Sequence, residues 1–320
     1  MNGVWVRAGV AALLLIGVFA GVVAILDATV FSADGFVRTY LGMLQRKDAT
    51  AALELAGPDA ASTALDDLLV PERMSDLDSF ALTDSPRTTG VHVDVAYVAD
   101  GKPGATGFDV VRTGSVLGFF PQWGFAASPL AEVDLTVLHT RSFTANGADL
   151  VAPAQDTEAT YLAFTPGVVT FAHTSELLEA SPVSVVLGEP GDIRSVQLDA
   201  RANDRFRQEV QAQADAFITS CLTQHVLQPT GCPFGQEIDD VVASEPDWSN
   251  VAFPEITIEP TPTAGEWLVP PATGVVHLSV KVQAYYDGSV TTYETDVPYD
   301  AVFVVTVTGT STFVVTPQID

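Results

Sequence analysis

An uninterrupted apolar run near the start places the strongest constraint on this chain. Residues 8–26 read AGVAALLLIGVFAGVVAIL and contain no charged residue and no Asn, Gln or Pro. As a helix rising about 1.5 Å per residue, the run would be about 28 Å long, close to the hydrocarbon thickness of about 30 Å in a bilayer. The segment therefore predicts one transmembrane helix.

The flanking charges predict the orientation of this helix. Arg7 and the amino terminus precede the run and Asp27 follows it, so the positive-inside rule places residues 1–7 in the cytoplasm and the rest of the chain outside. A cleaved signal peptide is the alternative, because Val18-Phe19-Ala20 fits the small-residue rule for a cleavage site. A retained anchor is favoured, since the apolar run continues from Gly21 to Leu26. A buried helix of a soluble domain is the least favoured interpretation.

The chain is strongly acidic, with 14 Lys and Arg against 40 Asp and Glu and a formal net charge of −26. Nucleic-acid binding needs clustered cations, so no nucleic-acid partner is predicted. The imbalance grows towards the end, because Lys281 is the only Lys or Arg after Gln208. A solvated acidic surface is the favoured interpretation, and a binding surface for a basic partner or Ca²⁺ is the alternative.

The two cysteines, Cys221 and Cys232, predict one disulfide in an exported chain. The short loop that such a bridge closes corresponds to a stabilisation of about 3 kcal/mol. A zinc site is disfavoured, because His225 is the only further ligand at suitable spacing. The helix expected before the loop carries an apolar stripe that ends at the first cysteine: Phe206, Val210, Phe217 and Cys221.

Hydrophobic periodicity divides the exported part into three predicted units. Residues 33–128 begin with helical spacing and then change to the period-two alternation that is typical of strands. Residues 129–200 contain short alternating runs and a hairpin signal at Asn146-Gly147, which predicts a small β-sandwich. Residues 201–320 repeat the order of the first unit, with a long helix capped by Asn203 and then strands.

Within the last unit, strands are expected at residues 267–269, 276–286 and 302–315, with a turn at Asp287-Gly288. Prolines are interpreted as loop positions of this unit, because proline cannot donate to a β-ladder. These loop positions are Pro260, Pro262, Pro270 and Pro271.

The order of these segments resembles a known family. The segment VRTYLGMLQRKDATAALELAGP at residues 37–58 is similar to the opening helices of NTF2-like cone domains in exported actinobacterial and Gram-positive proteins. FFPQWGFAASPLAEVDL at residues 119–135 resembles the end of such a domain. Further elements resemble the β-module that follows and a second copy of the cone: Asn146-Gly147, Pro166-Gly167-Val168-Val169-Thr170, and the stretch from Asn203 through Cys221, Gly231-Cys232-Pro233-Phe234-Gly235, Trp248 and Trp267.

The resemblance implies an α+β chain. An N-terminal transmembrane helix would precede two NTF2-like, cystatin-like cone domains, at residues 33–128 and 201–320, that flank the β-sandwich at residues 129–200. Exported, anchored members look more often like non-catalytic interaction or assembly modules. Enzyme members use an acid/base carboxylate with an acidic or tyrosine partner inside the cone, and no Asp, Glu or Tyr of this chain matches those roles residue by residue. Fold alone does not decide function.

Motifs that carry chemistry are missing from the sequence. The five histidines are scattered, and no His-Glu-x-x-His, Gly-x-Ser-x-Gly or phosphate-binding Gly-Lys-Ser/Thr motif occurs. Acidic pairs such as Asp239-Asp240 lack the spacing of an EF-hand. No catalytic residue, metal ligand or cofactor is therefore predicted.

Five aromatic residues are candidates for lining an apolar pocket in each cone, although core packing is the favoured interpretation. The sequence predicts a non-catalytic interaction or assembly protein of the cell envelope, anchored in the membrane, with envelope or secreted proteins as partners. A carrier for a small apolar ligand is the first alternative, and an isomerase or hydrolase-type enzyme is the second. The candidate pocket residues are Trp123, Trp248, Trp267, Tyr285 and Tyr286.

Overall fold

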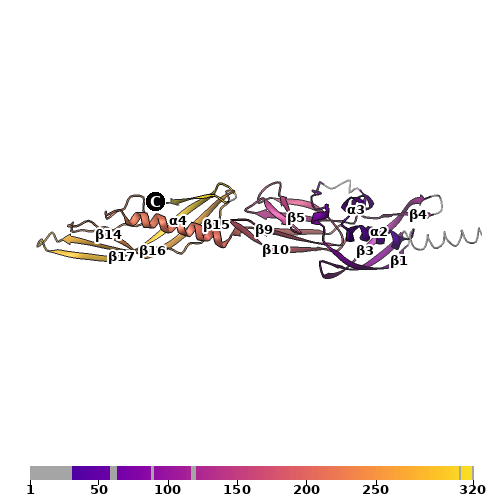
Figure 1. Ribbon diagram of the computed structural model, residues 1–320, viewed down its shortest axis with the longest axis horizontal. Coiled ribbons are helices and arrows are strands. Elements are labelled where there is room, and N and C mark those ends of the chain that lie inside the picture. The colour runs from indigo at the N-terminus through magenta and orange to yellow at the C-terminus, as the bar shows by residue number, and fades with distance from the viewer. Residues whose placement is uncertain (1–30, 58–62, 88–89, 117–119, 310, 319–320) are drawn as a thin grey trace, which may run out of the picture.

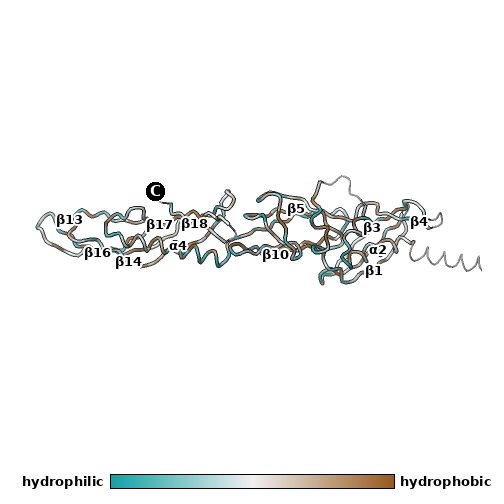
Figure 2. Tube along the Cα trace, turned by 45° about the horizontal axis from the view of Figure 1, so that its top comes forward, coloured by the Kyte–Doolittle hydropathy of each residue, from teal (hydrophilic) through white to brown (hydrophobic). Residues whose placement is uncertain are grey.

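The computed structural model describes residues 31–57, 63–87, 90–116, 120–309 and 311–318. In these ranges the chain forms an elongated rod, with the N-terminal unit at one end and a long hairpin at the other (Figure 1). Hydrophobic stretches, brown in Figure 2, recur in all three units along the rod. Each unit accordingly has its own hydrophobic core.

The predicted membrane helix requires a correction. Residues 8–26 and the expected cytoplasmic head at residues 1–7 lie outside the described residues. Among the helices that the structure does describe, none combines the length and apolar character needed to cross a bilayer. The prediction of a membrane-spanning protein therefore has no support from the structure.

The prediction of an α+β chain with two NTF2-like cones is wrong, because the described chain is mostly β. Residues 63–69 of the first unit form turns and one bridge and contain no helix. Helical periodicity marks only short segments, whereas period-two alternation continues through most of the chain. The described helices are α2 (Ala33–Gln45), α3 (Ala49–Ala56), the 3₁₀ helix η1 (Pro71–Arg73) and α4 (Asp204–Leu222).

In the first unit, α2 and α3 pack on a four-stranded antiparallel meander. Ser32 caps α2 by accepting a hydrogen bond from the Gly35 amide, and Asp48 caps α3. The buried Tyr40 hydroxyl donates to the Pro129 and Thr165 carbonyl oxygens, which ties this unit to the next. The strands, in spatial order, are β1 (Leu77–Arg87), β2 (Gly90–Ala99), β3 (Lys102–Val116) and β4 (Phe120–Phe125).

The middle unit consists of two sheets with a shared core, ordered β12-β10-β9-β6-β7 and β11-β5-β8. Asn146 and Gly147 have positive φ angles of 48° and 84° and form the predicted hairpin turn between β6 and β7. The strands are β5 (Leu130–Leu138), β6 (Ser142–Ala145), β7 (Ala148–Val151), β8 (Glu158–Phe164), β9 (Gly167–Thr174), β10 (Leu178–Leu187), β11 (Ile193–Asp199) and β12 (Arg201–Ala202).

In the C-terminal unit, α4 packs on a six-stranded sheet that contains the two longest strands of the described chain. The buried stripe of α4 differs in part from the predicted one, because Ala214 and Ile218 are buried whereas Phe217 is only partly buried. The strands are β13 (Val241–Val242), β14 (Asp247–Ala252), β15 (Glu259–Pro260), β16 (Glu266–Gln283), β17 (Val290–Val307) and β18 (Phe313–Gln318).

Candidate functional site

The hairpin of β16 and β17 projects to the far end of the rod (Figure 1). Its pairing runs from Glu266 opposite Thr306 to Gln283 opposite Val290. Strands of 18 residues at about 3.3 Å per residue span roughly 60 Å, whereas a 19-residue helix such as α4 spans about 28 Å. The distal part of the hairpin therefore extends beyond the reach of the helix.

Hydrogen bonds hold the turn at the end of this hairpin in one conformation. The Gly288 amide donates to the Ala284 carbonyl oxygen at 3.0 Å, and the Ala284 amide donates to the Ser289 carbonyl oxygen at 3.0 Å. Gly288 has a φ of 73°, which glycine adopts at little cost. The Asp287 carboxylate accepts from the Ser289 amide at 3.0 Å and from its hydroxyl at 2.7 Å.

This turn presents two tyrosines to solvent. Tyr285 is 77% exposed and Tyr286 is 99% exposed. Three exposed valines lie beside the turn. Val290 is the first residue of β17, and Val241 and Val242 form β13, where Val241 pairs with Gln283 at the end of β16. We call this set the tip patch: Tyr285, Tyr286, Val290 (55% exposed), Val241 (42%) and Val242 (39%). Apolar and aromatic side chains gathered at one exposed end are typical of an interaction site.

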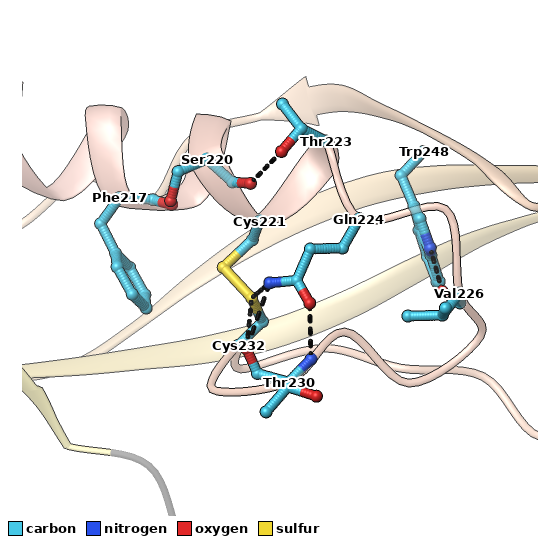
Figure 3. Close-up of a disulfide and its surroundings, with 9 residues drawn as sticks. All are labelled: Phe217, Ser220, Cys221, Thr223, Gln224, Val226, Thr230, Cys232 and Trp248. Carbon is cyan, nitrogen blue, oxygen red and sulfur yellow. Dashed lines mark hydrogen bonds between the residues drawn. A yellow bond between two sulfur atoms is a disulfide. The ribbon is translucent and has the colours of Figure 1, made fainter.

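A disulfide-linked loop leads from α4 to β13 and so to the tip patch. The structure confirms the predicted bridge between Cys221 and Cys232, with an S–S distance of 2.07 Å (Figure 3). Inside the loop, the Gln224 amide group bonds the backbone of Thr230 at both its oxygen and its nitrogen. The Trp248 indole N–H donates to the Val226 carbonyl oxygen at 2.9 Å. The loop is thus fixed to the sheet that carries the tip.

Carboxylates surround the approach to the tip. Asp247 on β14 and Glu294 on β17 both lie opposite Ser279 of the central strand β16, and both are exposed. Asp287 lies in the turn itself, and hydrogen bonds from the Ser289 hydroxyl and amide lower the pKa of its carboxyl. Lys281 on β16 is exposed as well. The tip therefore combines aromatic rings with negative charge.

The five aromatic candidates from the sequence lie apart, one in the first unit and four in the C-terminal unit. Trp123 is half-buried in the first unit, where its indole N–H donates to the Phe31 carbonyl oxygen at 2.7 Å and the Arg112 guanidinium lies 5.3 Å from its ring. Trp248 is buried in the C-terminal core against Phe234. Tyr285 and Tyr286 point to solvent at the tip. Sequence reasoning did not include Val241, Val242 and Val290 in this site, although the predicted Asp287-Gly288 turn marked its position.

Trp267, the fifth candidate, lines a pocket of about 260 Å³ between the middle and C-terminal units. The pocket also contains His139, whose ring lies 5.8 Å from the Trp267 ring, and the buried His173. Burial lowers the pKa of His173, although a hydrogen bond involving the Ser142 backbone opposes this shift. The pocket thus offers an apolar wall beside a buried imidazole whose pKa is lowered.

The pocket does not have the geometry of a nucleophilic enzyme. The Nε2 atom of His173 lies 3.2 Å from the Ser175 hydroxyl oxygen. That hydroxyl donates to the Leu178 carbonyl oxygen at 3.1 Å and accepts from the Leu178 amide at 3.0 Å. The one hydroxyl proton of Ser175 is used in the bond to the Leu178 carbonyl oxygen, so it is not donated to His173. Ser175 is therefore a structural residue of this turn rather than an activated nucleophile. Across the described residues, no group of three or more His, Cys, Asp or Glu side chains is arranged to hold a metal ion.

Comparison with protein-family models, curated proteins and solved structures gives no match for this chain. The function is therefore argued from the geometry of the tip and the pocket.

Proposed function

We propose that the protein is a non-catalytic interaction protein that works outside the cytoplasm and presents its hairpin tip to a protein partner. The observation that carries this proposal is the near-complete exposure of Tyr285 and Tyr286 on a hydrogen-bonded turn. Two tyrosine rings that stay exposed to water do not stabilise the fold by burial, whereas tyrosines are enriched in the hot spots of protein interfaces. A turn that is already ordered also lowers the entropy cost of binding.

The disulfide supports an extracytoplasmic location. Disulfides such as Cys221–Cys232 persist in oxidising compartments and are rare in the cytosol of most organisms. A role in the cell envelope or among secreted proteins is consistent with an elongated rod that carries its contact surface at one end (Figure 1).

A second candidate function is the binding of a small ligand in the pocket between the middle and C-terminal units. The wall formed by Trp267 and His139 favours a compact molecule with an apolar ring. We rank this candidate second because its volume of about 260 Å³ lies below the range of about 300 to 1,000 Å³ that is usual for ligand pockets.

Site-specific photo-crosslinking in the cells that produce the protein tests the proposal. A photoreactive residue at Val290, in the tip patch, should form a discrete adduct with a second protein. The same residue at Val151, which is 64% exposed in the middle unit, is the matched control and should not form that adduct. Adding Tyr285→Ser and Tyr286→Ser to the Val290 probe should remove the adduct. Equal crosslinking from Val290 and Val151 would contradict the proposal.

A further inference from the structure

We infer that the partner of the tip patch is a cationic protein segment, rich in Arg or Lys, that places its charged groups against the two tyrosines. This inference rests on the proposed function and specifies the chemistry of the partner. It depends on the charge of the C-terminal unit, on the aromatic pair and on the exposed carboxylate beside that pair.

The charge of the C-terminal unit selects a cationic partner. After Gln208 the chain has one basic residue, Lys281, against fifteen Asp and Glu. Asp247 and Glu294 flank the same position of the central strand, two strand spacings apart, so their carboxylates reinforce each other on one face. Screening at physiological salt acts over about 8 Å, so each carboxylate acts mainly on charged groups that approach it within about that distance. Such a surface attracts cations and repels anions.

The turn adds groups that recognise a cation at short range. A guanidinium or ammonium group is attracted to the face of a tyrosine ring, and Arg also stacks on aromatic rings. Asp287 follows Tyr286 directly, and its Oδ1 atom is occupied by Ser289. The Asp287 side chain is exposed to solvent. The turn therefore offers two exposed rings and an exposed carboxylate to an incoming Arg or Lys.

The same charges disfavour other occupants of the tip. A second copy of the chain would bring two acidic hairpin ends together, which like-charge repulsion opposes. An anionic lipid surface would be repelled in the same way. A zwitterionic bilayer lacks this repulsion, so it is included as an outcome of the test.

Peptide binding to the purified full-length chain tests the inference. The probes are a fluorescent 12-residue peptide of alternating Arg and Gly and its counterpart of alternating Glu and Gly. The Arg peptide should bind, and binding should weaken when the salt concentration rises. Tyr285→Ser with Tyr286→Ser should lower the affinity about tenfold, as expected for the loss of two exposed cation–π contacts. Val151→Ser, which removes an exposed valine far from the tip, should leave the affinity unchanged.

Several outcomes would overturn the inference. These are equal binding of the Arg and Glu peptides, an unchanged affinity in the double tyrosine variant, or binding only to phosphatidylcholine vesicles. The crosslinking experiment separates this inference from the proposed function. An adduct from Val290 with a partner that has no basic segment would overturn the inference alone, whereas no tip-dependent adduct would overturn both.

Discussion

The Tyr299 ring occupies the space that a side chain at Gly274 would need on the neighbouring strand. The two residues are directly paired, and a Cβ at Gly274 would lie 2.4 Å from the Tyr299 Cζ atom. The first sheet repeats this arrangement, since a Cβ at Gly104 would lie 2.4 Å from Cζ of its partner Tyr97. In both sheets the glycine has no side chain, which leaves room for the ring of the paired tyrosine to lie over the neighbouring strand.

Gly274→Ala should therefore lower the free energy of unfolding by about 1 to 3 kcal/mol, as overpacking does in a tight core. The ring cannot move away freely, because Tyr299 is buried and packs against Phe234 with ring centroids 5.5 Å apart. Urea unfolding followed by far-UV circular dichroism measures the loss. Gly188→Ala is the matched control, since a Cβ there meets only ordinary contacts at 3.9 and 4.0 Å. Equal losses in the two variants would contradict the packing argument.

Tyr299 should also contribute to the loss of stability at alkaline pH. Burial, together with the charge of Asp215, raises the pKa of Tyr299 from 10.0 to about 12. Between these values the unfolded chain ionises this group while the folded chain keeps it neutral, so stability is complete below pH 10 and falls as the pH rises towards 12. Tyr299→Phe should flatten this fall. It should cost little at pH 7, because the buried hydroxyl has no hydrogen-bond partner within the described ranges of the chain.

Urea unfolding of Tyr299→Phe and the unchanged protein at pH 7 and pH 11 gives the required comparison. Tyr286→Phe, at a ring that is 99% exposed, is the control and should follow the unchanged protein. If Tyr299→Phe loses as much stability between the two pH values as the unchanged protein, the assignment of the alkaline effect to this residue is wrong.

Removing the disulfide should destabilise the C-terminal unit. Cys221 and Cys232 are 11 residues apart, and closing a loop of this size corresponds to about 3 kcal/mol. Cys221→Ser with Cys232→Ser should lose about this amount in urea unfolding. Ser220→Ala, at the neighbouring exposed position, should be near neutral. Rapid alkylation of both cysteines in the native, unreduced protein would show that the bridge does not form.

Asn203 should matter more than an ordinary helix cap. Its side-chain oxygen accepts from the Phe206 amide at 2.9 Å, and its side-chain nitrogen donates to the carbonyl oxygens of Ser175 and Glu176 in the middle unit. Loss of a cap costs about 1 kcal/mol, and each further hydrogen bond adds about 1 kcal/mol. Asn203→Ala should therefore cost about 2 to 3 kcal/mol. The simple cap variant Asp48→Ala should cost about 1 kcal/mol, and equal losses would exclude the bridging role.

Local signals in the sequence identified several features of the fold. The turn at Asn146-Gly147, the cap at Asn203 and the bridge between Cys221 and Cys232 all follow from residues close in the chain. Each depends on the chemistry of one or two side chains, such as a tolerated positive φ or an amide oxygen at a helix start. Such local signals do not depend on how the rest of the chain folds.

The class of the fold and the length of the hairpin did not follow from local signals. Pro270 and Pro271 were interpreted as a loop, but they lie inside β16, where the register shifts between Val269 and Ala272. A bulge tolerates proline because the backbone there need not donate to the ladder. Residues 290–296 are a strand although none of them is fully buried, since pairing with β16 holds them. In both segments, pairing with the neighbouring strand rather than the local sequence pattern determines that the residues form a strand.

The order of the tip turn should depend on the ionised Asp287 carboxylate. Hydrogen bonds from the Ser289 hydroxyl and amide lower the pKa of this group below its usual 3.8. The folded turn therefore gains from these bonds above pH 3.8 and loses them as the pH falls through the lowered value. Asp287→Ala should reproduce the acid effect at neutral pH, with faster hydrogen exchange at the Ser289 amide and weaker binding of the Arg-Gly peptide.

Global stability should not change in Asp287→Ala, because the residue is fully exposed and the turn lies beyond the packed core. Asp300→Ala, which removes an exposed carboxylate on β17 that accepts from the Thr273 hydroxyl at 2.6 Å, leaves the turn intact and should leave exchange at Ser289 unchanged. Backbone amide exchange by NMR, combined with urea unfolding, separates a local loosening from a general loss. Unchanged protection of Ser289 in Asp287→Ala would mean that the backbone bonds between Ala284 and Gly288 order the tip without the carboxylate.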